Sequence, residues 1–217
     1  MTITIMTDIV DSFFLDYKNE LIKKIKKKGY EVKFINDRKK ITNGKILFCI
    51  SCKSILNDKE LKKNLYNIVV HPSKLPKGRG SAAVANEILN NSNKIYISLF
   101  EATNKLDTGD IYLQDFFNLS GLELNDEIRK KQANLTNKMV LKFLDLLKTK
   151  KIKKKKQKII INKFLKKRYP EDSQLNINKS IKSQLNLLRI CDNKRYPAFF
   201  HYKKKKFLIK IYDINDK

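Results

Sequence analysis

The chain has 217 residues but no tryptophan, only 2 histidines, 3 cysteines, 4 prolines and 6 glycines. An odd and small number of cysteines does not form a disulfide framework, so we expect a cytoplasmic protein. No apolar run approaches the roughly 20 residues that a membrane helix needs, and the first residues, MTITIMTDIV, lack the layout of a signal peptide. Because 41% of the residues are hydrophobic, the chain can still bury a core. The sequence therefore predicts a globular protein that does not enter a membrane.

Acidic residues are also scarce, with 22 Asp and Glu against 48 Lys and Arg and a net charge of +26. Such a balance is typical of nucleic-acid-binding proteins. However, only 6 of the basic residues are arginine, the side chain best suited to bidentate contacts with phosphates and bases. Twelve basic residues and no acidic one lie in the stretch Lys148–Arg168. We interpret this stretch as a solvated connector, and we do not expect nucleic acid as a partner.

Strand and helix patterns alternate over the first two-thirds of the chain, which predicts an α/β layered sheet with ligands at the carboxyl ends of its strands. Apolar or alternating runs predict the strands Thr2–Thr7, Tyr30–Ile35, Lys45–Ile50, Asn67–His71, Lys94–Phe100 and Ile111–Phe117. Helical spacing of apolar residues predicts the helices Phe14–Gly29, Leu56–Leu65, Ala82–Leu89 and Leu124–Leu147.

The pattern changes after the lysine-rich connector. A helix is predicted over Ile177–Ile190, and a hairpin over Ala198–Tyr202 and Phe207–Tyr212, joined by Lys203–Lys206. We therefore divide the chain into a domain at 1–148, a connector at 149–167 and a small α+β appendage at 168–217. The terminal hairpin is a candidate interface for a homodimer, and the oligomeric state is left open.

Candidate chemistry begins with His71, which ends an apolar strand and opens the loop HPSKLPKGRG. A lone histidine is as readily structural as functional, but the carboxyl end of a strand is where α/β sheets bind ligands. The sequence LDTGD at 106–110 taken alone reads as an ordinary turn. Cys49 and Cys52 form a C-x-x-C pair without a following redox helix or a second pair for zinc, so we interpret them as structural. The glycine-rich loop matches neither the dinucleotide nor the Walker pattern.

Taken together, these motifs resemble a known family. HPSKLPKGRG at 71–80 and LDTGDI at 106–111 are similar to the paired motifs of methionyl-tRNA formyltransferase-like enzymes, which use 10-formyltetrahydrofolate. The stretch Arg168–Phe200, which contains RYPEDSQLNINKS and NLLRICDNKRYPAFF, resembles the start of the C-terminal domain in the nucleotide-sugar N-formyltransferase branch. The resemblance implies a Rossmann-like domain with a mainly parallel sheet, followed by the α+β appendage, and it implies no metal.

The resemblance also implies roles for individual residues. His71 would stabilise the oxyanion that forms when an amine attacks the formyl carbon, and Asp107 would orient the imidazole and accept the amine's proton. The backbone of the loop 73–80 would lie close to the folate, with Phe48–Ser51 and Ala102–Asp107 lining the pterin slot. The donor-binding residues implied in this way are Ser51, Ser73, Leu75, Pro76, Lys77, Gly78, Ala102 and Thr103.

One position departs from the family pattern. The family carries a third catalytic residue, an asparagine, two positions before the histidine, where this chain has Val69. Asn67 stands four positions before His71, which is about 13 Å away along a strand, so it is a poor replacement unless the strand ends early. Removing one oxyanion donor typically costs about 10²–10³ in turnover. Ser73, Asn104 or a backbone N–H could supply the missing donor.

The expected acceptor is the amine of a UDP- or dTDP-linked 4-amino-deoxy sugar, for polysaccharide or glycan synthesis. The C-terminal piece is shorter than the tRNA-acting branch normally carries, and an arginine could hold a diphosphate while a tyrosine stacks on a base. Alternatives are a methionyl-tRNA formyltransferase and a non-catalytic folate- or nucleotide-binding module. The sugar, the nucleotide and the amine are left open. The substrate-binding residues expected are Arg79, Arg168, Tyr169, Arg189 and Tyr196.

Overall fold

The computed structural model describes residues 1–158 and 164–214. Six strands form a sheet in the order β2-β1-β3-β4-β5-β6. Strands β1 to β4 are parallel, whereas β5 runs antiparallel to both of its neighbours. The predicted α/β fold with a mainly parallel sheet is confirmed. The strands are β1 Thr2–Met6, β2 Glu31–Ile35, β3 Gly44–Ile50, β4 Asn64–His71, β5 Lys94–Glu101 and β6 Ile111–Asn118.

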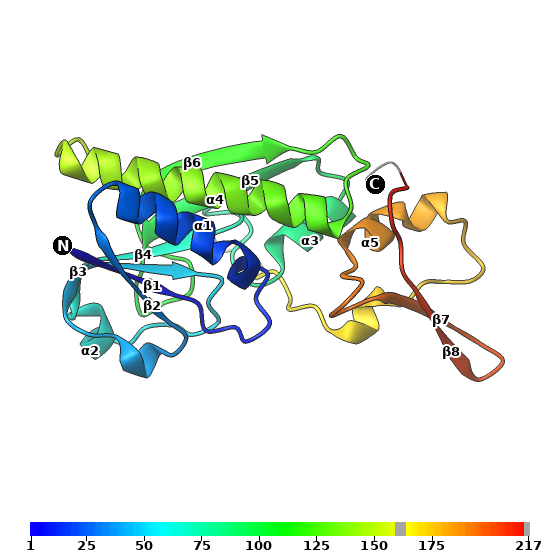
Figure 1. Cartoon of the computed structure of the whole chain (residues 1–217). Coiled ribbons are helices and arrows are strands. Elements are labelled where there is room, and N and C mark those ends of the chain that lie inside the picture. The colour runs from blue at the N-terminus through cyan, green and yellow to red at the C-terminus, as the bar shows by residue number, and fades with distance from the viewer. Residues whose placement is uncertain (159–163, 215–217) are drawn as a thin grey trace.

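Two long helices, α1 (Phe14–Lys27) and α4 (Asn125–Lys148), cover one face of this sheet (Figure 1). Alternate strand residues point toward these helices and form the main core with them. Phe48, for example, is fully buried, and its ring packs edge-on against Phe143 of α4 at 5.8 Å. The expectation that Phe48 lines the pterin slot is therefore wrong, because its side chain lies on the helix-covered face.

The opposite face of the sheet has a smaller cover. Met6, Leu47, Cys49 and Val69 lie on this face and pack with apolar residues from loops and from the short helix α2 (Asp58–Leu61). The Cys52 thiol and burial together raise the pKa of Cys49 well above its ordinary value. This is the opposite of an activated thiol, and it agrees with a structural role for the pair.

The C-terminal part is small and irregular. It contains 3₁₀ turns at Pro170–Ser173 and Lys182–Gln184, helix α5 (Leu185–Ile190) and a hairpin of β7 (Ala198–Tyr202) and β8 (Lys205–Ile209). The hairpin projects away from the large sheet (Figure 1). Among the described residues, none of the helices is long and apolar enough to cross a membrane.

Several predicted elements differ in extent from those observed, and for three of them the difference is large or has a clear cause. The helix predicted at Leu56–Leu65 shrinks to α2, because Asn64 already pairs with Gly44 in the sheet. The helix predicted from Ile177 begins only at Lys182, as a 3₁₀ turn. The hairpin turn is shorter than predicted, because Lys203 and Lys204 both adopt positive φ and let β8 begin at the next residue.

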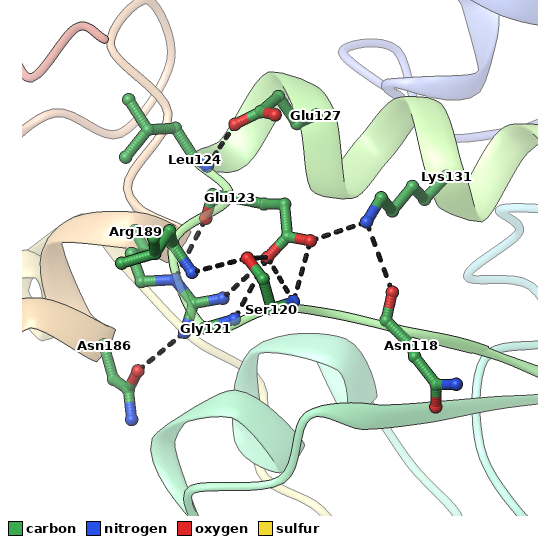
Figure 2. A network of polar contacts seen from close by, with 10 residues as sticks. Asn118, Ser120, Gly121, Glu123, Leu124, Glu127, Lys131, Asn186 and Arg189 are labelled. Atoms are coloured by element: carbon green, nitrogen blue, oxygen red, sulfur yellow. Dashed lines mark hydrogen bonds and ion pairs between the residues drawn. The ribbon is translucent and has the colours of Figure 1, made fainter.

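A buried polar network attaches the C-terminal part to the sheet domain (Figure 2). The Glu123 carboxylate accepts hydrogen bonds from the N–H and O–H of Ser120 at 2.9 and 3.0 Å and from Lys131 Nζ at 2.5 Å. Arg189 of α5 donates from Nε to the Glu123 carbonyl at 3.0 Å and from a terminal nitrogen to Asn186 at 2.9 Å. Glu123 thus connects the end of β6, the start of α4 and α5.

Candidate functional site

The two sequence motifs meet at the end of β4. His71 is the last residue of that strand and is 9% exposed. Its Nε2 lies 2.9 Å from the carbonyl oxygen of Gly78 and 3.7 Å from Oδ2 of Asp107. Because a carbonyl oxygen only accepts hydrogen bonds, Nε2 carries the proton in this contact. Asp107 is also buried, at 8% exposure, so the pair is largely shielded from water.

Side chains of β5 and β6 hold the loop that follows His71 through hydrogen bonds to its backbone. The Ser98 hydroxyl donates to the Ser73 carbonyl at 2.6 Å and accepts from the Leu75 N–H at 3.2 Å. Gln114 donates to the Leu75 carbonyl at 2.9 Å and to the Ser98 hydroxyl at 2.9 Å. Sequence analysis missed both supports, because a lone polar residue within a predicted strand gives no local motif.

Two residues expected to bind the donor turn their side chains away from the surface. Ser73 is 1% exposed, and its hydroxyl donates to the Lys77 carbonyl at 3.1 Å. Leu75 is 3% exposed and forms a cis peptide with Pro76. The backbone groups of Ser73 and Leu75 are engaged as well, and the Ser73 hydroxyl is not available to replace the missing asparagine.

A glycine brings the loop close to His71 and Asp107. Gly80 has a φ of +113°, and its N–H donates to Oδ2 of Asp107 at 2.9 Å. A Cβ at this position would lie 2.5 Å from the carbonyl oxygen of Leu165, so only glycine fits. The oxygen Oδ2 that approaches His71 is thereby fixed by a backbone donor.

The LDTGD turn is more constrained than an ordinary turn. Asp107 has a φ of +53°, and Gly109 packs so closely that a Cβ there would lie 1.7 Å from the Glu101 carbonyl oxygen. The hydroxyls of Thr103 and Thr108 lie 2.8 Å apart and tie the two sides of the turn together. The turn therefore has a defined shape, in which Oδ2 of Asp107 lies 3.7 Å from Nε2 of His71.

Neither of the asparagines considered as replacements for the family residue is available. Strand β4 continues through to His71, so Asn67 stays distant along it, and its amide donates to the carbonyls of Leu61 and Asn64 at 2.8 and 3.2 Å. The Asn104 amide donates to Asp58 at 3.0 Å. Among the donors considered, a backbone N–H is the one left.

The other donor-binding residues lie around the same edge. Ser51 directly follows β3, and the pairing of Ile50 with Val70 places it beside the end of β4. It adopts a φ of +54° and contacts the Ser12 hydroxyl at 2.8 Å. Ala102 follows β5, and its N–H donates to the Asn67 carbonyl at 2.6 Å. Contact of these residues with a folate stays a prediction.

The expected substrate-binding residues do not form one group. Arg189 is 1% exposed and engaged with Glu123, so the prediction that it binds a diphosphate is wrong. The Arg168 guanidinium donates to the Asp172 carbonyl at 2.7 Å, and the Arg79 guanidinium lies over the ring of Phe164 at 5.0 Å. The side chains of Tyr169 and Tyr196 are exposed. For Arg79, Arg168 and the two tyrosines, contact with a substrate stays a prediction.

Within the described residues, no three His, Cys, Asp or Glu side chains lie together in a way that could hold a metal ion. A buried imidazole next to a buried carboxylate can orient a proton and stabilise developing charge on an oxygen.

No family model matches this sequence. Curated relatives do. A methionyl-tRNA formyltransferase from Fusobacterium nucleatum is 31% identical over 159 residues, which cover 70% of this chain and 49% of that protein. One from Thermotoga neapolitana is 34% identical over 108 residues, which cover 48% of this chain and 34% of that protein. The chain thus spans about a third to a half of the length of these relatives.

Solved structures share the fold over nearly the whole chain. The structure of a methionyl-tRNA formyltransferase from Clostridium thermocellum has a TM-score of 0.80 at 22% identity. The match covers 100% of this chain and 95% of that chain. A sugar N-formyltransferase from a Shewanella species has a TM-score of 0.66 at 15% identity, with 97% of each chain covered. HypX from Aquifex aeolicus, solved with tetrahydrofolic acid, has a TM-score of 0.80 at 17% identity, covering 96% of this chain and 37% of HypX. The solved structures show that this chain has the fold of these proteins, and the curated relatives show that its sequence is similar to that of methionyl-tRNA formyltransferases.

Proposed function

We propose that this chain transfers a formyl group from 10-formyltetrahydrofolate to a primary amine, and that the amine belongs to a nucleotide-linked 4-amino-deoxy sugar. The observation that carries the transfer chemistry is the buried contact between His71 and Asp107, formed by two motifs that lie far apart in the sequence. Both residues stand at the positions that the formyltransferase resemblance assigns to catalysis.

His71 and Asp107 divide the work in this proposal. Attack by the amine nitrogen on the formyl carbon places negative charge on the formyl oxygen and leaves an extra proton on the nitrogen. The Nε2–H that His71 donates to the Gly78 carbonyl in this structure turns to that oxygen and stabilises it, while the Asp107 carboxylate orients the ring and takes the proton, directly or through a water molecule. Collapse of the intermediate then breaks the bond between the formyl carbon and the folate nitrogen. The proton held by Asp107 passes to that nitrogen, directly or through a water molecule, so that it leaves as a neutral secondary amine.

The loop and the strand ends fit a folate donor. A pterin ring presents donors and acceptors in one plane, and the ends of β3 and β5 bring backbone groups to the edge of the sheet where His71 lies. The loop beside them is fixed by Ser98 and Gln114, so its shape is set before a ligand arrives. Lys77 adds a positive charge that suits a polyanionic folate tail.

The sugar acceptor rests on the similarity to the Shewanella sugar N-formyltransferase over nearly the whole chain and on the sequence resemblance of Arg168–Phe200 to that branch. Methionyl-tRNA is the second candidate, favoured by the curated relatives and by the net charge of +26. A tRNA acceptor requires binding that weakens steeply with salt, because phosphate contacts release counterions. A sugar acceptor does not.

The test combines the protein with 10-formyltetrahydrofolate and a panel of UDP- and dTDP-linked 4-amino-deoxy sugars and charged methionyl-tRNA. Formylated products are identified by mass spectrometry. His71→Ala is expected to abolish turnover while folate affinity is kept, and His201→Ala is the matched control, because His201 lies exposed in β7. Formylated tRNA without formylated sugar would replace the proposed acceptor. Folate binding without any product would make the chain a non-catalytic binding module.

A further inference from the structure

The lysine-rich connector does not simply lead away from the sheet. After α4, Lys155 forms two backbone hydrogen bonds with Ile111, each 2.8 Å long, and so adds a short strand segment to the edge of β6. Further along, Leu165 pairs with the glycine-rich loop, accepting from Ser81 at 3.1 Å and donating to Arg79 at 2.8 Å. The interpretation of this stretch as a solvated connector is therefore wrong at these two places.

Gln157 makes the contact that matters most for the site. Its side-chain amide donates to the Gly109 carbonyl at 2.6 Å and to the Asp107 carbonyl at 3.2 Å. It is half-buried in a run where Ile152 is the only other residue from 150 to 158 that is not lysine.

Asp107 is thereby held from two sides. Gly80 donates to its carboxylate, and Gln157 donates to its carbonyl. Because Leu165 pairs beside Gly80, both supports depend on the same connector. An aspartate with a φ of +53° adopts a sparsely populated conformation, so contacts outside the turn are needed to keep it populated.

We propose that Gln157 is a positioning residue, which holds the LDTGD turn so that the Asp107 carboxylate faces His71. The proposal rests on the proposed formyl transfer. The connector then has a second role besides joining the two parts of the chain, because it sets the geometry of the catalytic aspartate. A misplacement of about 1 Å in a reacting group can cost about 10²-fold in rate, so a contact that touches no substrate can still control turnover.

Three variants test this role in the full-length protein. Gln157→Glu keeps the size of the side chain but presents a carboxylate to two carbonyl oxygens, while Gln157→Ala removes the group. Lys156→Ala, at an exposed neighbouring position, is the matched control. We expect kcat for formyl transfer to fall about 10–100-fold in both Gln157 variants. We expect KM for 10-formyltetrahydrofolate to stay within about threefold, and Lys156→Ala to match the wild type.

The comparison of Glu with Ala separates donation from packing. A side chain that merely fills space is replaced well by the isosteric Glu and badly by Ala. If the Gln157 amide acts as a hydrogen-bond donor, both variants lose that donor. The Gln157→Glu variant therefore decides between donation and packing. Wild-type kcat in Gln157→Glu, or a loss confined to KM, would overturn the proposal.

Amide hydrogen exchange at residues 107–110 provides a readout that does not need activity. We expect exchange there to accelerate at least about fivefold in both Gln157 variants, since each lost hydrogen bond contributes about 1 kcal/mol. A wild-type protein without turnover on any acceptor would refute the proposed function. The exchange rates at residues 107–110 would then be the only measurement that tests whether Gln157 holds the turn. Unchanged exchange in both variants would refute that role.

Discussion

Glu123 provides the sharpest test of how the two parts of the chain hold together. Its carboxylate is buried, receives five hydrogen bonds from Ser120, Gly121 and Lys131 within 3.2 Å, and lies 3.6 Å from the Arg189 guanidinium (Figure 2). Burial alone would raise the pKa of Glu123, but these donors outweigh it and lower the pKa to about 2. The perturbation is Glu123→Gln, which keeps the shape and removes the charge.

The size and sign of the effect follow from proton linkage. A carboxyl whose pKa falls on folding stabilises the folded state above its unfolded pKa of 4.5 and loses that contribution as the pH falls toward about 2. The shift corresponds to about 3 kcal/mol at pH 7, of which about 2 kcal/mol is lost by pH 3. Glu123→Gln also leaves Arg189 without its counter-charge in a buried place, which adds to the cost at both pH values.

Urea unfolding of both proteins at pH 7 and pH 3 measures this effect. We expect the variant to be less stable by at least about 3 kcal/mol at pH 7, and the gap to narrow by about 2 kcal/mol at pH 3. Glu171→Gln is the control, because that carboxylate is exposed in the 3₁₀ turn. A gap that is the same at both pH values would refute the assignment of the low pKa to Glu123.

Three further substitutions address the site. Gly109→Ala is expected to reduce the free energy of unfolding by at least about 3 kcal/mol, because its Cβ would lie 1.7 Å from the Glu101 carbonyl oxygen. Wild-type stability of this variant in a thermal melt would contradict the expectation. Asp107→Asn should fold normally, since asparagine tolerates positive φ, while kcat falls about 10²–10⁴-fold; retained kcat in steady-state assays would remove Asp107 from the chemistry. Val69→Asn should raise kcat by up to about 10²-fold, because it restores the donor found in the family. It should also lower Tm, because the amide is placed against an apolar cluster. An unchanged kcat in a folded variant would show that backbone donors suffice.

Most of the fold could be predicted because the sheet domain follows period-two and helical patterns closely. The strand predicted at Asn67–His71 is buried and apolar, and the structure extends it only to Asn64. The failures lie where tertiary contacts overrule local patterns. Ile177–Ile181 has helical spacing, but the Gln184 side-chain amide donates to carbonyls of this segment instead, at 3.3 Å to Lys179 and 3.4 Å to Ser180.

The candidate site was predictable only where a motif marks it. His71 and Asp107 stand in recognisable loops, and the structure brings them together. Gln157, Ser98 and Gln114 support those loops from segments that carry no motif, so their roles depend on the fold. Arg189 was mistaken for a substrate contact, because an arginine near a resembling motif does not reveal whether it is buried.

Val69 makes one face of the proposed site apolar. Its side chain packs with Cys49 and Ala102 on the less covered face, so this face of the site is apolar where the family has an amide. An apolar surrounding strengthens each remaining electrostatic contact, since the local dielectric constant is low. With fewer donors, turnover then depends more heavily on how well the remaining groups are placed. Gly80 and Gln157 both donate hydrogen bonds to Asp107, to its carboxylate and to its carbonyl. These two bonds supply the accurate placement on which the proposed reaction depends.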